Sequence, residues 1–297
     1  MIETTGSRPH RSTELLLLVV VFIWAANAPL VKFGLVGLDP LVFNSLRFLV
    51  AGIALAALFF ARSSWRNVPL KDWYRLTGLA LIAHVVYQMA YIFGIKNTTV
   101  GNSAIILSTS PLWTVFFNSV IHKEKVPGKA WVGMLVSLSG IVLIVIGTGS
   151  TLVLGGDAFL GDVLSLVAAL LWALSTTLQR NFLKEYSATQ LTVILVGLGA
   201  ILLTVAAIPS AFILRWGDVD AKFYVAAVCS GAMSIGAATV LWAVGIKNIG
   251  PRRTANFNNL VPVLAFVFAY LTLGENMYPL QVLGAAVTLV GVWLARR

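Results

Sequence analysis

Long apolar runs alternate with short polar connections along nearly the whole chain. A helix needs roughly 20 apolar residues to cross a hydrocarbon core about 30 Å thick. Runs of this length predict ten membrane-spanning helices, at residues 14–36, 41–61, 73–95, 100–120, 129–147, 159–179, 188–212, 221–245, 253–273 and 279–295. The connections leave no room for a soluble domain. We therefore expect an all-α integral membrane protein.

The chain contains a repeated sequence segment. Residues 94–140 recur as residues 245–291 at a constant offset of 151, without a gap. The matching pairs are Ala104 and Ala255, Pro111 and Pro262, Glu124 and Glu275, Gly133 and Gly284, and Gly140 and Gly291. Further upstream, Trp24 and Trp172 differ by 148 instead. We expect a first five-helix repeat at 14–147, a second at 159–295, and an N-terminal segment at 1–13.

The positive charges predict how the repeats are oriented. The termini and the loops on their side of the predicted membrane hold sixteen of the 21 Lys and Arg residues, and the other side holds four. Short loops rich in Lys and Arg stay in the cytoplasm, so both termini and segment 1–13 are expected there. Five spans are an odd number, so the second repeat begins on the opposite side. The prediction is two inverted repeats around a central cavity.

The N-terminal segment raises an alternative. Arg8 and Arg11 before an apolar run resemble a secretory signal peptide. The run is too long for one, however, and continues to Val36, so we expect a retained first helix in a bacterial-type inner (plasma) membrane.

Composition narrows the classes of partner. The chain is 59% hydrophobic and 11% charged, against about 25% charged in soluble proteins. A single cysteine, Cys229, excludes an intramolecular disulfide and a cysteine-based metal cluster. The net charge of +10 is spread over short loops and does not favour nucleic acid. We expect a small-molecule substrate and the lipid bilayer as partners, with no metal or other cofactor.

Span 3 carries the clearest candidate site. His84, Tyr87, Gln88 and Tyr91 have the spacing i, i+3, i+4, i+7 and share one helix face. A pocket for a small amphipathic solute needs apolar walls and a few placed polar groups, which this face combines. The alternative is hydrogen bonding between helices without ligand contact. The other candidates for cavity lining are Trp24, Asn27, Ser108, Trp113, Trp172, Thr176, Gln179, Met233, Trp242, Asn256 and Asn259.

Two prolines lie at equivalent points of the repeats. Pro111 and Pro262 cannot donate a backbone hydrogen bond, and are expected to free the carbonyls of Leu107 and Asn258. Broken helices near the midplane are common in transporter sites. We expect these prolines to act in gating; the alternative is a kink that serves packing alone.

Arg47 is the one charged residue inside a predicted span without an obvious anionic neighbour. We favour snorkelling to the interface or a pair with Asp39, with attraction of a substrate carboxylate as the alternative. All eleven acidic residues fall in loops or near span ends, so the sequence offers no carboxylate relay for protons at the midplane. If protons are coupled, His84 is the natural candidate.

Small residues in spans 5 and 10 predict close helix packing. Gly133 and Ser137, and likewise Gly284 and Thr288, lie four residues apart. They fit either internal packing or a dimer face, so we expect a monomer or a weak homodimer.

These features resemble the EamA-type exporters of the drug/metabolite transporter superfamily. The resemblance is carried by Trp24-Ala25-Ala26-Asn27 through Lys32, and by the motif Gly94, Asn97, Ala104, Pro111, Glu124, Gly133 and Gly140 with its second copy. It implies a cavity lined mainly by spans 1, 3, 4, 6, 8 and 9. Within the family, the chain looks most like aromatic amino-acid exporters.

The sequence thus predicts a secondary transporter that exports amino acids or related small metabolites by alternating access. Nucleobases, sugars or drugs are alternative substrates. An intramembrane enzyme is a weaker alternative, because it needs a catalytic constellation. Only three histidines exist, and His10 and His122 lie outside the predicted membrane core.

Overall fold

The computed structural model describes residues 8–62, 66–125, 128–147, 156–275 and 278–294. Helices occupy all ten predicted spans. The first repeat comprises α1 (Arg8–Gly37), α2 (Pro40–Arg62), α3 (Leu70–Ala80) with η1 (Leu81–Val86) and α4 (Tyr87–Asn97), α5 (Val100–Leu107) with α6 (Ser110–His122), and α7 (Gly128–Ile146). The second comprises α8 (Asp157–Phe182), α9 (Ala188–Ile213), α10 (Ala221–Ser230) with η3 (Gly231–Ala238) and α11 (Thr239–Ile249), α12 (Pro251–Ala255) with η4 (Asn256–Leu260) and α13 (Val261–Leu273), and α14 (Pro279–Leu294). A short 3-10 turn, η2 (Trp216–Asp218), lies in the loop before α10.

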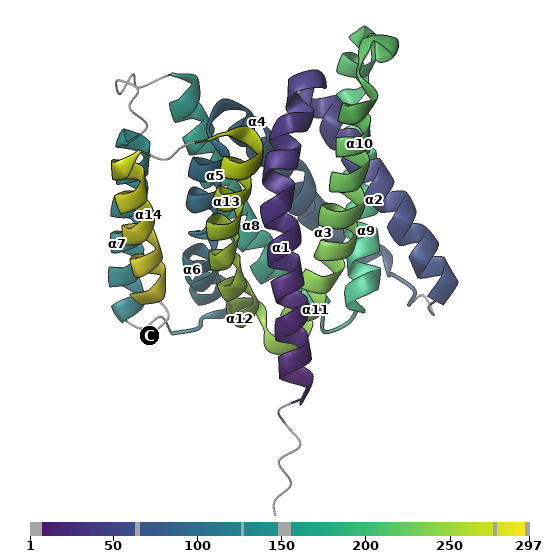
Figure 1. Cartoon of the computed structure of the whole chain (residues 1–297). Helices are drawn as coiled ribbons and strands as arrows, with labels where there is room; N and C mark the ends of the chain where they lie inside the picture. Colours follow the sequence, from purple (N-terminus) through teal and green to yellow (C-terminus); the bar gives the residue numbers. More distant parts are fainter. Residues whose placement is uncertain (1–7, 63–65, 126–127, 148–155, 276–277, 295–297) are drawn as a thin grey trace, which may run out of the picture.

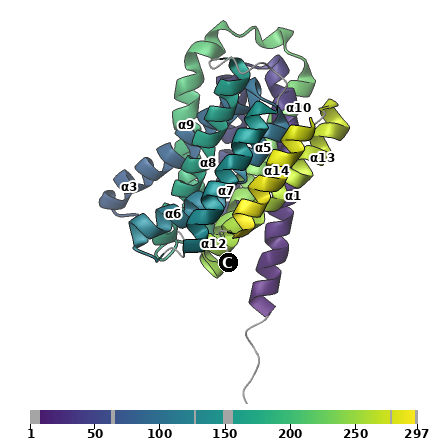
Figure 2. The same ribbon diagram turned by 90° about the vertical axis from the view of Figure 1, so that its left-hand side faces the viewer.

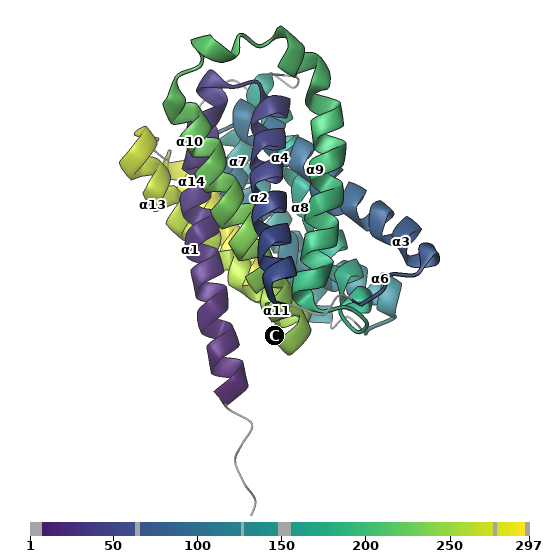
Figure 3. The same cartoon turned by 90° about the vertical axis from the view of Figure 1, so that its right-hand side faces the viewer.

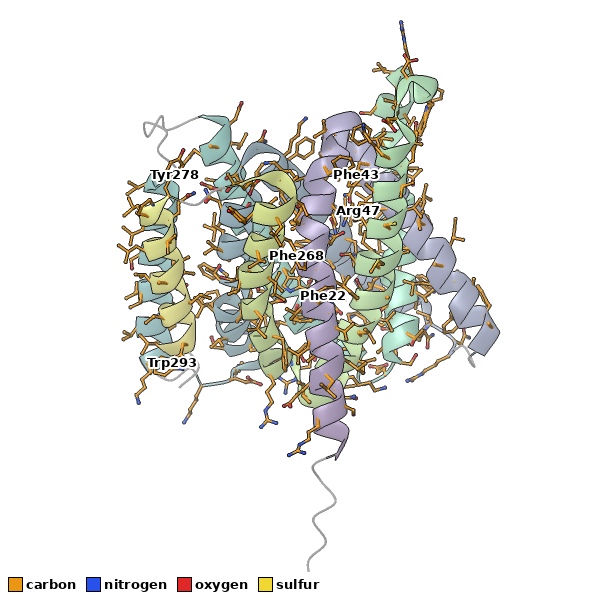
Figure 4. All side chains as sticks on the ribbon, in the orientation of Figure 1. Phe22, Phe43, Arg47, Phe268, Tyr278 and Trp293 are labelled. Atoms are coloured by element: carbon orange, nitrogen blue, oxygen red, sulfur yellow. The ribbon has the colours of Figure 1, made fainter. Side chains whose placement is uncertain are left out.

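The helices form one bundle of membrane dimensions (Figure 1). Among the described residues, seven helices are long and apolar enough to cross a membrane, and three shorter apolar helices complete the spans. Helix α1 begins at the end of the bundle where α14 finishes, with Tyr278 and Trp293 near opposite ends of α14 (Figures 1 and 4). An even number of crossings requires this arrangement. The chain is a multi-pass membrane protein.

The inversion of the repeats is visible where α7 meets α14, which lie side by side in two views (Figures 1 and 2). A Cβ built on Gly140 would lie 2.7 Å from the carbonyl oxygen of Gly284, and one built on Gly291 would lie 2.6 Å from that of Gly133. The offset of 151 converts each contact into the other. Such reciprocal pairing is the mark of a two-fold axis, so α7 and α14 are equivalent helices that run antiparallel.

The small residues of spans 5 and 10 therefore serve internal packing. Backbone approaches this close are possible only without a Cβ at the crossing. Ser137 and Thr288 continue the same contact, with the Thr288 hydroxyl 3.4 Å from the Ser137 carbonyl oxygen. Of the two alternatives that the sequence leaves open for these residues, the structure shows the contact within one chain.

Each repeat also contains a π-helical segment, which the sequence pattern does not predict. The segments η1 and η3 interrupt spans 3 and 8, and adding 151 to residues 81–86 gives residues 232–237, inside η3. A π-helix closes its hydrogen bonds at i→i+5 and occurs frequently at functional sites. The two segments are equivalent points of the inverted repeats.

Spans 4 and 9 end in matched turns. Lys123 and Gly274, 151 residues apart, both adopt left-handed backbone conformations, with φ of 56° and 67°. The next amides, of Glu124 and Glu275, reach back six residues to the carbonyls of Asn118 and Ala269. This six-to-one pattern ends many helices. It places Glu124 and Glu275 at opposite ends of the bundle.

At each end of the bundle, hydrogen bonds connect loops that the charge pattern predicts to lie on the same side of the membrane. At one end, Glu275 contacts the start of α5, and Lys32 donates to the carbonyl of Thr98. At the other end, Arg180 pairs with Glu124, and Tyr186 donates to Asp72. Between the ends, two of the apolar core clusters each combine residues of both repeats.

Candidate functional site

A central cavity lies between the two repeats. It encloses about 880 Å³ of empty space, counting the part open to solvent. Spans 1, 3, 4, 6, 8 and 9 contribute to its lining, as the family resemblance implies, and span 2 adds Arg47.

Eight of the residues predicted from the sequence line this cavity. They are Trp24, Asn27, His84, Tyr87, Gln88, Tyr91, Ser108 and Trp172. All four members of the span 3 stripe are among them, although His84 lies in the π-helical segment η1. The His84 ring packs 5.4 Å from Phe48, and only 5% of the residue is exposed. The structure thus brings together residues from α1, spans 3 and 4, and α8.

Aromatic rings form one wall of the cavity. Trp24 and Trp172 meet edge to face, with ring centroids 5.1 Å apart. Tyr87 lies 5.2 Å from Trp172 and stacks 6.1 Å from Tyr91. Ring pairs at these separations contribute about 0.5–1.5 kcal/mol each beyond their burial. The wall is therefore a rigid apolar surface built from both repeats.

Trp242 lies behind this wall. It is 1% exposed, and its ring lies 5.0 Å from Trp24 and 5.6 Å from Trp172. The sequence-based expectation that Trp242 lines the cavity is corrected to a supporting position. A second support comes from η3, whose Ser234 carbonyl accepts the indole N–H of Trp24 at 3.3 Å. The π-helical segment thereby orients a cavity-lining ring.

Two further predicted residues of α8 are buried near the cavity but do not line it. Thr176 is 1% exposed and Gln179 is 7% exposed. Within the described part of the chain, the Trp172 indole nitrogen and the Thr176 hydroxyl have no hydrogen-bond partner. Unsatisfied buried polar atoms are uncommon and often mark a functional position.

Two predicted residues lie elsewhere. Trp113 packs in a satellite cluster with Leu112, Phe116 and Met134, and donates to the Thr109 hydroxyl at 3.2 Å. Met233 is 54% exposed on the outer surface of η3. The expectation that Met233 lines the cavity is therefore wrong; in a π-helical segment the α-helical period of 3.6 does not give the direction of a side chain. The side chains of Asn256 and Asn259 lie outside the described residues.

Asn258, which the α-helical pattern turns away from these two amides, lines the cavity. Its amide nitrogen lies 3.3 Å from the Ser110 hydroxyl. It lies in the 3-10 helix formed by residues 256–260, where the α-helical period of 3.6 does not apply. Asn258 joins the second repeat to α6 across the cavity.

Both prolines lie at helix breaks. Pro111 begins α6 after the turn at Ser108 and Thr109, and Pro262 begins α13 after η4. The expected break in each repeat is present, but the carbonyl of Asn258 is not free, because the Val261 N–H donates to it. The 3-10 turn supplies the donor that proline lacks. Their role in gating stays a prediction.

Arg47 is the residue whose place the sequence interpretation missed. It is 1% exposed and lines the cavity one turn from Phe43 on α2 (Figure 4). Figure 3 shows α2 in front, between α10 and α9. Asp39 does not pair with it; its carboxylate instead accepts from the Leu41 and Val42 amides at 2.9 and 3.3 Å. The absence of an acidic neighbour within its span was the available signal.

A contact between the repeats lies beside the cavity. Oε2 of Glu275 accepts from the Val100 amide at 3.0 Å and from the Gly101 amide at 3.4 Å. These amides belong to the first turn of α5. A carboxylate is stabilised there by the unpaired N–H groups and the helix dipole. Val100 itself lines the cavity. The equivalent Glu124 is bound instead to Arg180 at 2.7 Å.

Comparisons with known proteins agree with this architecture. The model of the EamA-like transporter family matches residues 11–146 and again 159–297. A transporter of Archaeoglobus fulgidus is 30% identical, with 96% of this chain and 97% of that protein covered. A protein of Escherichia coli named "probable amino-acid metabolite efflux pump" is 25% identical, with 96% and 94% covered.

The fold is also found among solved structures. One crystal structure superposes with a TM-score of 0.71 at 18% identity, covering 96% of this chain and 98% of that chain. The relatives are named as transporters or an efflux pump rather than as enzymes. The two family matches coincide with the two halves that surround the cavity, so the chain belongs to the EamA-like transporter family.

Proposed function

We propose that this transporter exports amino acids with aromatic or other apolar side chains through the central cavity. The observation that carries the proposal is the division of the lining into two parts. Trp24, Tyr87 and Trp172 form an aromatic wall, while Arg47 and Gln88 lie in a polar cluster. A small amphipathic solute needs both kinds of surface. The name of the Escherichia coli relative supports the same substrate class.

The helix geometry sets a scale for the substrate. On α1, Trp24 belongs to the aromatic wall, and Asn27 accepts from the Ser230 hydroxyl that contacts Arg47. Three residues of an α-helix rise about 4.5 Å. The apolar and polar parts of the cavity are thus one helical turn apart. An amino acid has a comparable separation between its carboxylate and its side chain.

Transport proceeds by alternating access between the inverted repeats. The helix breaks at Ser108–Thr109 and Asn256–Leu260 supply equivalent bending points, and Glu275 supplies a contact that closes one end. The end rich in Lys and Arg faces the cytoplasm of a bacterial-type inner membrane. Among the described residues that line the cavity there is no carboxylate. The substrate therefore moves down its own gradient.

Counterflow in proteoliposomes tests the proposal. Purified protein is loaded with unlabelled phenylalanine, leucine, uracil or glucose, and uptake of each labelled solute is measured. We expect counterflow for phenylalanine and leucine only. Uptake confined to uracil or glucose would transfer the function to those solutes. Uphill efflux driven by a pH gradient and retained in His84→Ala would contradict transport without coupling.

A further inference from the structure

The cavity contains a positive charge that the described protein does not neutralise. Arg47 is 1% exposed and lies at the eighth position of α2, about 10 Å along the helix from Pro40. The ion pairs among the described residues are Arg75–Asp72, Arg180–Glu124 and Lys222–Asp220, and Arg47 belongs to none of them. The described lining of the cavity holds no acidic side chain.

Neutral groups hold the guanidinium in place. Nε donates to the Ser230 hydroxyl at 2.7 Å, and Nη1 donates to Asn44 Oδ1 at 3.1 Å and to Gln88 Oε1 at 3.5 Å. The Phe43 ring lies 5.7 Å away. The Ser230 hydroxyl in turn donates to Asn27 Oδ1 at 2.6 Å. These partners orient the charge but do not cancel it.

The backbone is shaped to bring Arg47 to this place. A Cβ built on Gly231 would lie 2.3 Å from the Arg47 carbonyl oxygen, so α2 and η3 touch through their backbones. The equivalent residue of the first repeat, 151 positions earlier, is Ala80. The arginine is not repeated either. With the offset of 148 found near Trp24, the equivalent of Arg47 in the second repeat is Leu195; with the offset of 151, it is Leu198. The cavity therefore has one cationic pole.

Burying a charge without a counter-charge costs several kcal/mol. An ionisable residue inside the membrane region is by default a sign of function. A carboxylate is the natural partner, because the planar guanidinium matches it with two parallel hydrogen bonds. A bound carboxylate would offset part of the cost of burial, and the protein's own neutral partners leave that role open.

We infer that Arg47 binds the carboxylate of the transported solute and that Asn27 and Gln88 position it. The inference rests on the proposed function and deepens it, because it fixes the direction in which the solute lies. The carboxylate is held at Arg47, and the apolar side chain lies against Trp24, Tyr87 and Trp172. On α4, Gln88 contacts Arg47 at the polar end of the solute, and the adjacent Tyr87 contacts Trp172 in the aromatic wall at the apolar end.

The test compares an amino acid with analogues that lack the negative charge. Counterflow of labelled phenylalanine is competed with phenylalanine, phenylalaninamide, 2-phenylethylamine and phenylacetate. In the wild type, phenylalanine should compete at least about ten-fold better than the amide or the amine. Equal competition by all four would overturn the role of the carboxylate.

Substitutions then assign the effect to Arg47. Arg47→Met should raise the KM for phenylalanine at least about ten-fold and abolish the preference for the acid over the amine. Arg47→Lys keeps the charge without the planar fork and should give an intermediate KM. Arg75→Met removes a surface arginine, 60% exposed, and is the matched control with an unchanged KM. Gel filtration and thermal unfolding show whether each variant folds.

The outcomes separate the inference from the proposed function. If Arg47→Met folds and keeps the wild-type KM and acid preference, the inference is wrong while amino-acid export stands. If the wild type transports no amino acid but binds phenylacetate, and Arg47→Met loses that binding, the substrate class is wrong while the carboxylate site stands. If Arg47→Met does not fold, the ratio of acid to amine competition in Arg47→Lys decides, and a wild-type ratio overturns the inference.

Discussion

Glu275→Gln should loosen the contact proposed to close one end of the cavity. The Glu275 side chain belongs to the second repeat, and the amides of Val100 and Gly101 that it binds belong to the first. The second carboxylate oxygen lies 3.2 Å from the Val100 nitrogen. Gln retains one acceptor but loses the charge. The substitution therefore isolates the electrostatic part of the interaction.

The size of the effect follows from what a carboxylate contributes at a helix start. A side-chain cap contributes about 0.5–2 kcal/mol. A negative charge near the helix dipole contributes about 0.3–1 kcal/mol, and up to about 2 in partly buried positions. Loss of the charge at partly buried Glu275 should cost about 1 kcal/mol. That cost raises the opening equilibrium about five-fold, since 1.4 kcal/mol corresponds to a factor of ten.

Hydrogen exchange of the backbone amides measures this opening directly. The protein is placed in lipid nanodiscs, and exchange is followed by mass spectrometry in peptides that cover residues 98–103. Amides 100 and 101 should exchange about five-fold faster in Glu275→Gln, because opening removes their acceptor. Exchange in the middle of α9 should not change.

Glu124→Gln is the matched control, because Glu124 is the equivalent residue 151 positions earlier. It pairs with Arg180 at the surface, where the side chains are 45% and 39% exposed, and such pairs contribute about 0–1 kcal/mol. The equivalent of Val100 is Pro251, which has no N–H to donate. Unchanged exchange at residues 100–101 in Glu275→Gln, or an equal increase in Glu124→Gln, would refute the reasoning.

Four other substitutions test the packing, the wall and the turns. Gly140→Ala should destabilise the protein by about 1–3 kcal/mol, because its Cβ would lie 2.4 Å from the Thr288 hydroxyl oxygen. Thermal unfolding measures the change. Gly78→Ala is the control, because a Cβ at Gly78 would have no neighbouring atom within 4 Å. Trp172→Ala or Tyr87→Ala should raise the KM for phenylalanine more than that for leucine while the fold persists, and unchanged kinetics in both would remove these rings from the site. Lys123→Gly should stabilise the protein by about 1 kcal/mol. Lys123 adopts a left-handed backbone conformation with a φ of 56°, whereas the other repeat has Gly274 at the equivalent position. A lowered midpoint of thermal unfolding would contradict this.

The sequence predicts the scaffold well because membrane insertion leaves few alternatives. A span must satisfy its backbone internally, so long apolar runs become helices. The offset of 151 and the odd number of spans per repeat then require inversion, which the reciprocal contacts of Gly140 and Gly291 confirm. The partner of these glycines was not predictable, since small residues favour close approach without saying to which helix.

The site was less predictable because helix faces depend on the local period. In nearly uniform apolar spans, a single irregular turn redirects every later side chain. Met233 lies in the π-helical η3 and Asn258 in the 3-10 helix η4, where the α-helical period does not give the direction of a side chain. In the span 3 stripe, Tyr87, Gln88 and Tyr91 lie in the regular helix α4, where the α-helical period holds, and they line the cavity as predicted. Arg47 was missed because its distance from the span end suggested snorkelling, while its direction depends on the contact with Gly231.

The features shared by the two repeats concern how the helices bend, and the residues that differ between them concern how a solute is recognised. The matched breaks, π-helical segments and left-handed turns occur at equivalent positions, so we expect the two halves to bend in the same way. The residues proposed to contact a solute do not repeat: Arg47 corresponds to leucine, His84 to Ile235 and Gln88 to Thr239. The closing contact differs as well, because Pro251 stands where Val100 donates to Glu275. Two ends with unequal closing contacts open with unequal free energies. We therefore expect the repeated scaffold, with its single cationic side chain among the described lining residues, to bind a solute in one direction and to favour one closed end.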